Sequence, residues 1–437
     1  MKIHFIGIGG IGISALAQYM HFLGHEVSGS DMSDSHIVKK LQAMGITIVT
    51  PHSASAISDQ DLVIHSAIIK ENNVEIVEAK KRNIPILSRR EALKDILKTK
   101  KVYSVAGAHG KSTTTAMLSA IFEDADVLLG AESKAFGSNV RFKQSDTLVF
   151  EADESDASFL NSNPYCSLVI NAEKEHMEYY NYDSEKFFGA YKEFINLAPF
   201  KVLNAEDQFL ATLVDEIEAS WLYPSKDITN IEYFLKEDEP YTRFTLKDLG
   251  VFEVWGFGEH IALDASLAIL AALPSKDVEQ IRSLLVNFKG IKKRFDIVGK
   301  YNDLVVVDDY GHHPTEIKAT LSSAKEYAKL KNLSKIVAIW QPHKYSRTYD
   351  NLEAFVECFE GVDELVILPV WAASEEEIAI DFAKEFAKYN PTFATNVLHA
   401  NQSVTLLDGM QELKTYKDGF IIGFGAGDIT YQMREEH

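Results

Sequence analysis

Cysteine is scarce in this sequence: only Cys166 and Cys358 occur among 437 residues. The two are far apart and show no metal-ligand spacing, which argues against a disulfide framework and against a structural zinc site. The simplest interpretation is a protein of a reducing compartment, and we expect it in the cytoplasm.

Long apolar segments are also missing. No uninterrupted hydrophobic run approaches the roughly 20 residues that cross a bilayer, so we expect no membrane insertion. The apolar start of the chain loosely imitates an export signal, but Gly7, Gly9, Gly10 and Gly12 interrupt it. We therefore expect no export.

Basic residues are outnumbered. The chain has 44 Lys and Arg against 64 Asp and Glu, a formal net charge of −20. Nucleic-acid surfaces need Lys and Arg on backbone phosphates, so this balance argues against nucleic acid as a partner. Any phosphate site must be local, built from loops and helix ends.

What the chain does contain is a repeated alternation of short apolar strand patterns and helical patterns. Such alternation is typical of α/β proteins with parallel, doubly wound sheets. The length of 437 residues is too great for one ordinary domain. We predict three domains, at residues 1–98, 99–289 and 290–437.

The most informative stretch is 107–112, which reads Gly-Ala-His-Gly-Lys-Ser between a strand pattern, Val102–Ala106, and a helical pattern. Glycines and a helix N-terminus present N–H groups to phosphate oxygens. The lysine can reach the outer phosphates, and the serine hydroxyl can hold Mg²⁺. The standard phosphate loop has a glycine where Val105 stands. The stretch still predicts a nucleoside-triphosphate site.

A second glycine motif, Gly7-x-Gly9-x-x-Gly12, lies near the N-terminus, and Asp31 follows the next strand pattern. In a βαβ unit this arrangement suits NAD, but the same turn can hold any diphosphate, including that of a nucleotide sugar. The triphosphate loop downstream disfavours an NAD-linked dehydrogenase, which stays as an alternative.

Acidic residues and a histidine follow two strand patterns of the middle domain. Glu151–Asp156 comes after Thr147–Phe150, and Asn171–Glu178, which contains His176, comes after Leu168–Ile170. Ligands of open α/β sheets bind at the carboxyl ends of strands. Mg²⁺ takes oxygen ligands, usually shared between carboxylates and substrate phosphates. These stretches therefore predict a Mg²⁺ site.

Two polar clusters, Asp308–Pro314 and Gln341–Thr348, follow strand patterns of the last domain. Because both lie at carboxyl ends, we expect them to line one crevice. Their imidazole and cationic groups suit the clamping of a carboxylate or a phosphate.

Together these motifs resemble the Mur ligase family, the ATP-dependent amide-forming enzymes of peptidoglycan synthesis. The resemblance covers the whole chain in order and includes Phe288-x-Gly290-x-x-Lys293-Arg294-Phe295 and Gly425–Asp428. It implies an α/β fold of three domains: N-terminal Rossmann-like for a UDP-sugar, central P-loop ATPase-type, and C-terminal Rossmann-like. It implies that ATP phosphorylates the lactyl carboxylate of UDP-N-acetylmuramate and that L-alanine attacks the acyl phosphate.

The resemblance also implies roles for single residues. Lys111 would hold the outer phosphates of ATP, and Arg294 and Asp309 would position it. Ser112 and Glu154 would bind one Mg²⁺, and His176 would bind a second. The catalytic set would be Lys111, Glu154, His176, Arg294 and Asp309. The ATP loop would comprise Gly107, Ala108, His109, Gly110, Lys111, Ser112 and Thr113.

Two further sets are implied for the other substrates. The UDP-sugar set is Gly9, Gly10, Ser14, Asp31 and Ser66. The set for the amino acid and the muramyl carboxylate is His312, His343, Lys344 and Arg347. We expect a monomer or a weak dimer.

The chain departs from the family at several positions. The usual His-Asn-x-x-Asn appears here as His260-Ile261-Ala262-Leu263-Asp264, and Lys344 stands where arginine is usual. The lost asparagines leave open a nucleotide-sugar binding protein without catalysis. Within the family, a second alternative is a recycling ligase that adds a preformed tripeptide to the same nucleotide sugar.

Overall fold

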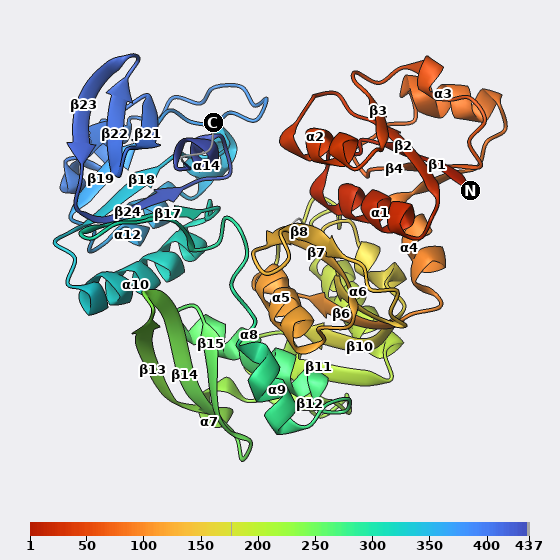
Figure 1. The fold of residues 1–437 in the computed structure, drawn as a ribbon, viewed down its shortest axis with the longest axis horizontal. Helices are drawn as coiled ribbons and strands as arrows, with labels where there is room; N and C mark the ends of the chain where they lie inside the picture. Colours follow the sequence, from red (N-terminus) through yellow and green to blue (C-terminus); the bar gives the residue numbers. More distant parts are fainter. Residues whose placement is uncertain (176, 435–437) are drawn as a thin grey trace. The chain divides into compact units, whose positions relative to one another are not determined.

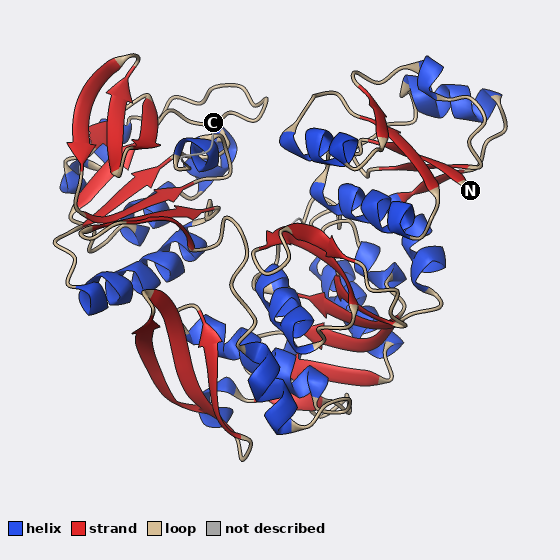
Figure 2. Ribbon diagram, in the orientation of Figure 1, coloured by secondary structure: helices blue, strands red, loops and turns tan. Residues whose placement is uncertain are grey.

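A computed structural model describes residues 1–175 and 177–434 (Figure 1). Helices and strands alternate along most of the chain, as predicted (Figure 2). None of the helices in these residues is both long enough and apolar enough to span a bilayer. The chain forms two compact units. Unit 1 contains Met1–Asn230, Phe244–Val254 and Ala262–Lys289, and unit 2 contains Ile231–Arg243, Trp255–Ile261 and Gly290–His437.

Unit 1 begins with a five-stranded parallel sheet in the order β3-β2-β1-β4-β5. The chain runs outward from β1 through β2 and β3, then crosses to β4 and β5 on the other side. Ligands bind beyond the carboxyl ends of strands at such a switch point. The elements are β1 (Lys2–Ile6), α1 (Ile11–Phe22), β2 (Glu26–Ser30), α2 (His36–Ala43), β3 (Thr47–Val49), η1 (Ala54–Ala56), β4 (Leu62–His65), α3 (Val74–Lys81), β5 (Ile86–Ser88) and α4 (Arg89–Leu97).

Side chains of β1 alternate between the two faces of this sheet. Ile3 shares a hydrophobic cluster with Leu16 of α1 and Leu93 of α4, whereas Ile6 packs in a separate cluster with Ile76 of α3. Helices α1 and α4 therefore cover one face, and α3 covers the other. The first cluster continues into the next sheet of unit 1, so the two sheets share a core.

That next sheet has seven strands in the order β12-β11-β10-β6-β9-β7-β8. Strand β6 lies between β10 and β9. In this sheet β7 and β8 pair antiparallel, whereas the other neighbouring strands pair parallel. The elements are β6 (Lys101–Ala106), α5 (Lys111–Ile121), β7 (Asp126–Ser133), β8 (Ser138–Arg141), β9 (Thr147–Glu151), η2 (Ser158–Asn161), β10 (Pro164–Val169), α6 (Ser184–Leu197), β11 (Phe200–Asn204), η3 (Leu210–Leu213) and β12 (Ser220–Leu222).

A three-stranded sheet in the order β13-β14-β15 follows, as the turn-rich β patterns of this region predict. The next helix, α8, is apolar over most of its surface, because it is packed inside the protein. The elements are α7 (Pro224–Asp227), β13 (Ile228–Lys236), β14 (Glu239–Leu246), β15 (Gly250–Trp255), α8 (Glu259–Ala272) and α9 (Val278–Leu285).

Unit 2 contains a six-stranded sheet in the order β16-β17-β24-β18-β19-β20. Its long helix α10 starts at a proline, which suits the first position of a helix, and packs its apolar stripe on the sheet. The elements are β16 (Asp296–Lys300), β17 (Leu304–Asp309), α10 (Pro314–Lys331), β18 (Ile336–Trp340), α11 (Tyr345–Asp350), α12 (Leu352–Cys358), β19 (Glu364–Ile367), α13 (Phe382–Glu385), η4 (Ala387–Tyr389), β20 (Thr392–Phe393), β24 (Gly419–Phe424) and α14 (Ile429–Gln432).

Two features of unit 2 differ from a purely parallel sheet. Strand β16 is antiparallel to β17, because the short connection between them can join only antiparallel neighbours. A separate antiparallel sheet consists of β21 (Asn396–Ala400), β22 (Ser403–Asp408) and β23 (Gln411–Tyr416). Asn401 and Gln402 both have positive φ in its first turn, the geometry that a two-residue hairpin requires.

Candidate active site

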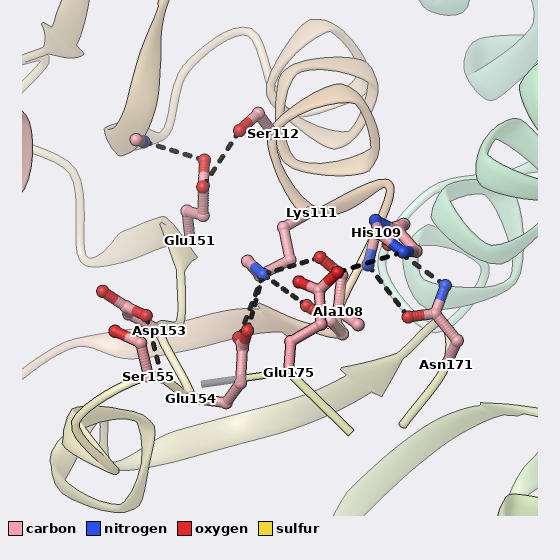
Figure 3. Close-up of polar contacts among 12 residues, drawn as sticks. Ala108, His109, Lys111, Ser112, Glu151, Asp153, Glu154, Ser155, Asn171 and Glu175 are labelled. Atoms are coloured by element: carbon pink, nitrogen blue, oxygen red, sulfur yellow. Dashed lines mark hydrogen bonds and ion pairs between the residues drawn. The ribbon is translucent and has the colours of Figure 1, made fainter. Parts of the chain in front are cut away.

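The loop after β6 is arranged around Lys111. Gly110 has a φ of +81° at the N-cap of α5, a conformation that favours glycine. The Lys111 side chain folds back, and Nζ donates to the carbonyl oxygens of Gly107 (2.5 Å) and Ala108 (3.1 Å) and to Glu154 Oε1 (3.0 Å) (Figure 3). The ammonium is thus held among oxygen atoms, the ligands that a phosphate would also supply.

Lys111 and Glu154 form a buried ion pair; only 1% of the Glu154 side chain is exposed. Burial raises the pKa of Glu154 to about 7, and the ammonium offsets only part of that effect. Burial would lower the pKa of Lys111, but the carboxylates of Glu154 and Glu151 outweigh burial and raise it. The lysine is therefore charged and available to a triphosphate.

Glu151, the last residue of β9, is a candidate that the sequence analysis does not single out. It accepts hydrogen bonds from the Ser112 hydroxyl (2.9 Å) and from the Gly130 amide (2.8 Å). The sequence predicts Ser112 as a metal ligand together with Glu154. In the structure Ser112 bonds to Glu151, while Glu154 is engaged by Lys111 (Figure 3). Glu151 is the first residue of the acidic stretch Glu151–Asp156, so its place directly after a strand could have identified it from the sequence.

Asn171 fixes the backbone of the same loop. Its side chain accepts from the His109 amide (3.0 Å) and donates to the His109 carbonyl (3.2 Å) (Figure 3). The His109 ring lies 3.4 Å from a carboxylate oxygen of Glu175. His176, which the resemblance predicts to bind a second Mg²⁺, lies outside the described residues.

Oxygen donors suited to Mg²⁺ surround the loop: the Ser112 hydroxyl and the carboxylates of Glu151 and Glu154. Across residues 1–175 and 177–434, no three His, Cys, Asp or Glu side chains are grouped as a ready-made metal site. The donor set fits a hard cation that takes its remaining ligands from substrate phosphates and water, which is the usual coordination of Mg²⁺.

The first glycine loop, at the end of β1, is closed by an acidic residue. Asp31 Oδ2 accepts a hydrogen bond from the Gly9 amide (2.8 Å), and Gly7 has a φ of +78°. Ser66 lies against Gly7: a Cβ atom added to Gly7 would be 3.2 Å from the Cβ atom of Ser66. The Ser14 hydroxyl donates to the Ile11 carbonyl (2.8 Å). These predicted UDP-sugar residues thus gather at the switch point of the sheet.

A cavity of about 410 Å³ in unit 1 connects the two glycine loops. Gly10 and Gly12 line it from the first loop, Lys111 lines it from the second, and Glu154 lines it from the segment after β9. Arg89, the first residue of α4, lines it too. Two phosphate-type loops therefore open into one space.

In unit 2 the predicted residue Arg294 lies near two carboxylates, those of the predicted Asp309 and of Glu316. Asp309 accepts from the amides of Phe295 (2.7 Å) and Gly311 (2.7 Å). Burial raises the pKa of Asp309 to about 6, despite the nearby Arg294 guanidinium. Arg294 donates to Glu316 Oε1 (3.0 Å). A cation and two carboxylates therefore lie together at the end of β17.

The second predicted cluster of unit 2 lies nearby. The His312 and His343 rings are 5.8 Å apart. Arg347 donates to His343 Nδ1 (3.0 Å); because arginine has no acceptor, this nitrogen carries no proton. Burial, with His312 and Arg347 nearby, lowers the pKa of His343 to about 4. The Lys344 ammonium lies 3.9 Å from Glu375.

Three family models match successive parts of the chain. "Mur ligase family, catalytic domain" matches residues 2–101, "Mur ligase middle domain" 105–272, and "Mur ligase, glutamate ligase domain" 293–419. The protein is a Mur ligase. The predicted fold class, α/β with three domains and Rossmann-like first and last domains, is confirmed, and so is its class as an ATP-dependent amide-forming ligase.

Relatives of this Mur ligase extend over nearly its whole length. A UDP-N-acetylmuramate–L-alanine ligase of Campylobacter curvus is 54% identical over 99% of both chains. One of Helicobacter pylori is 56% identical over 100% of this chain and 96% of its own. The crystal structure of a UDP-N-acetylmuramate-alanine ligase from Thermotoga maritima, 28% identical, covers 99% of this chain and 97% of its own, with a TM-score of 0.81.

The departure at Asp264 has a physical explanation in this Mur ligase. Asp264 lies beneath the phosphate loop, where its Oδ1 would be 2.7 Å from a Cβ atom on Gly110. Burial raises its pKa well above the usual value, which favours the neutral carboxyl over the carboxylate. In the neutral form the carboxyl repels phosphates less than a carboxylate would, and like an amide it has a hydrogen to donate.

Proposed function

We propose that this Mur ligase joins L-alanine to the lactyl carboxylate of UDP-N-acetylmuramate at the expense of ATP, in the synthesis of peptidoglycan precursors. The carrying observation is 54–56% identity over 99–100% of the chain to ligases of that name. The arrangement of Lys111 in a triphosphate-type loop supports the ATP-dependent step.

The chemistry needs an activated carboxylate, because a free carboxylate is a poor electrophile. A lactyl oxygen attacks the γ-phosphorus of ATP, and ADP leaves with the electrons of the broken P–O bond. The neutral amine of L-alanine then attacks the carbonyl carbon, and the tetrahedral intermediate expels phosphate and loses a proton. The negative charge that accumulates in both steps needs fixed cationic groups.

Lys111 supplies one of these cations at the phosphate loop. Loop N–H groups from residues 107–113 orient the triphosphate there. Ser112 and Glu154, with Glu151 beside them, would hold one Mg²⁺, and His176 would hold a second. When bound, Mg²⁺ supplies Lewis-acid stabilisation of the phosphoryl oxygens. Glu154 can bind Mg²⁺ in this way only in its ionised form.

The remaining residues take the roles that the sequence predicts. Gly9, Gly10, Ser14, Asp31 and Ser66 hold the UDP-sugar. Arg294 and Asp309 contribute to ATP binding. His312, His343, Lys344 and Arg347 orient the amino acid and the muramyl carboxylate. We also propose a cytoplasmic location, where ATP and the nucleotide sugar are available, and a monomer or weak dimer.

The test is phosphate release from ATP and Mg²⁺ with UDP-N-acetylmuramate and single amino acids. We expect release only when both the nucleotide sugar and L-alanine are present. Release with a preformed tripeptide but not with L-alanine would indicate the recycling ligase instead. Nucleotide-sugar binding without release under any combination would indicate a non-catalytic binding protein.

A further inference from the structure

Arg89 is a largely enclosed cation with unused hydrogen-bond capacity. Only 15% of its side chain is exposed, and it lines the 410 Å³ cavity between the two glycine loops. Its neighbours are Asp153, at 3.5 Å, and Asp156, at 4.0 Å. Both distances exceed the roughly 2.7–2.9 Å of a charge-assisted hydrogen bond. Within residues 1–175 and 177–434, the guanidinium makes no hydrogen bond.

The position of Arg89 on its helix is also unusual. It is the first residue of α4, where the helix dipole disfavours a cation. The adjacent capping box, Ser88 with Glu91, shows that this helix start is otherwise well formed. A cation at this place therefore needs an anion near it, and Asp153 and Asp156 supply that charge only at a distance.

Arg89 also explains the third glycine of the first loop. A Cβ atom on Gly12 would lie 3.1 Å from Arg89 Cζ and 3.2 Å from Nη2. The guanidinium thus rests against the backbone of the loop, at the start of α1. Any side chain at position 12 would displace it.

We infer that Arg89 binds the diphosphate of the UDP-sugar substrate, exchanging its distant carboxylate neighbours for phosphate oxygens. The inference rests on the proposed function, in which the first glycine loop holds that substrate. A guanidinium presents a planar fork that matches phosphate oxygens in a bidentate manner. Its place against Gly12 puts this fork beside the loop amides, so that both can engage the same anion.

The test compares Arg89→Ala, Arg89→Lys and Arg90→Ala by calorimetric titration with UDP and with uridine. Arg90 is the matched control: it is the next residue of the same helix turn, carries the same charge, and donates to the Tyr179 hydroxyl (2.6 Å). We expect Arg89→Ala to weaken the binding of UDP by about 10- to 100-fold, as for a lost hydrogen bond to a charged group. Arg89→Lys should recover part of this, and Arg90→Ala should change nothing.

Uridine separates a direct contact from a structural role. If Arg89 contacts the diphosphate, Arg89→Ala leaves the affinity for uridine unchanged. The ratio of UDP affinity to uridine affinity then falls by the same factor as the UDP affinity itself. Equal weakening of both ligands would overturn the inference, as would unchanged UDP binding. Loss of UDP-N-acetylmuramate affinity alone, with UDP unaffected, would also overturn it. If the wild-type protein does not bind UDP, the proposed function itself fails.

Discussion

Lys111 is the single side chain on which the ATP-dependent step most depends. We expect Lys111→Ala to reduce ligation by at least about 100-fold, because a preorganised cation is lost where charge develops. UDP binding should persist, since the first glycine loop lies on another sheet. Phosphate release and UDP titration measure the two effects. Lys101→Ala is the control, because that ammonium packs on the Tyr165 ring instead; near-normal turnover in Lys111→Ala would refute the loop assignment.

Gly130 makes room for Glu151. A Cβ atom there would lie 2.4 Å from Glu151 Oε1, so Gly130→Ala must displace the carboxylate that accepts from Ser112. We expect the KM for ATP to rise by roughly tenfold, and overpacking to cost about 1–3 kcal/mol of unfolding free energy. Steady-state kinetics and urea unfolding check both. Gly189→Ala, in α6 with open space around it, should leave kinetics unchanged and not destabilise the protein.

Side-chain identity predicted much of the site but not all of it. Lys111 and Glu154 belong to motifs whose spacing carries a mechanism, so the sequence alone points to them. Arg89 and Gly130 have no such local signal. Their roles arise because α4 and β7 bring them against Gly12 and Glu151, residues distant in the chain. Contacts of that kind depend on tertiary packing.

The start of α10 is stabilised by Glu316. Burial would raise the pKa of Glu316, but Arg294, His312 and the His312 amide outweigh it and lower the pKa to about 2 from its usual 4.5. A lowered pKa stabilises the fold above pH 4.5, and this stability is lost as the pH falls towards 2. The contribution near pH 7 is on the order of 2–3 kcal/mol.

We therefore expect Glu316→Gln to be less stable than wild type at pH 7, with the difference shrinking at pH 3. Urea unfolding at both pH values measures this. Glu326→Gln is the control on the same helix, since its side chain is 39% exposed and lies 4.0 Å from Lys329; it should change little at either pH. A Glu316→Gln deficit that does not depend on pH would contradict the prediction.

Among helices and strands, the buried ones were the most predictable. β17 and β18 are rich in apolar residues because both of their faces are covered: α10 and α12 pack on one face, and β22 and α14 pack on the other. The hairpin β7–β8 and the sheet β21–β23 were missed, because polar and charged residues interrupt the apolar ones in their sequences. The positive-φ pair Asn401–Gln402 shows that hairpin turns form without the glycine that usually marks them.

The chain as a whole carries one thiol in each compact unit. Cys166 lies in β10 of unit 1 and Cys358 in α12 of unit 2, and both are buried. Burial raises the pKa of both thiols, that of Cys358 to about 12. Neither should react with a thiol reagent until its own unit opens.

In variants that keep only one of the two cysteines, thiol labelling should thus report the unfolding of each unit separately as urea is added. We expect UDP to shift labelling of the thiol at 166 to higher urea, because a ligand stabilises the part of the protein that binds it. The urea concentration at which the thiol at 358 becomes labelled should not change. Equal shifts at both positions would mean that the units unfold together, and no shift at 166 would place the UDP site elsewhere.

The contact between Gly12 and Arg89 has a consequence for how this protein can change over evolutionary time. The two positions are not free to vary independently: a methyl group at 12 would have to displace the guanidinium that occupies the adjoining space. Homologues with a short side chain at 89 can accept alanine at 12, whereas those with arginine at 89 should keep glycine. Arginine at 89 therefore predicts glycine at 12, and alanine at 12 predicts a shorter side chain at 89.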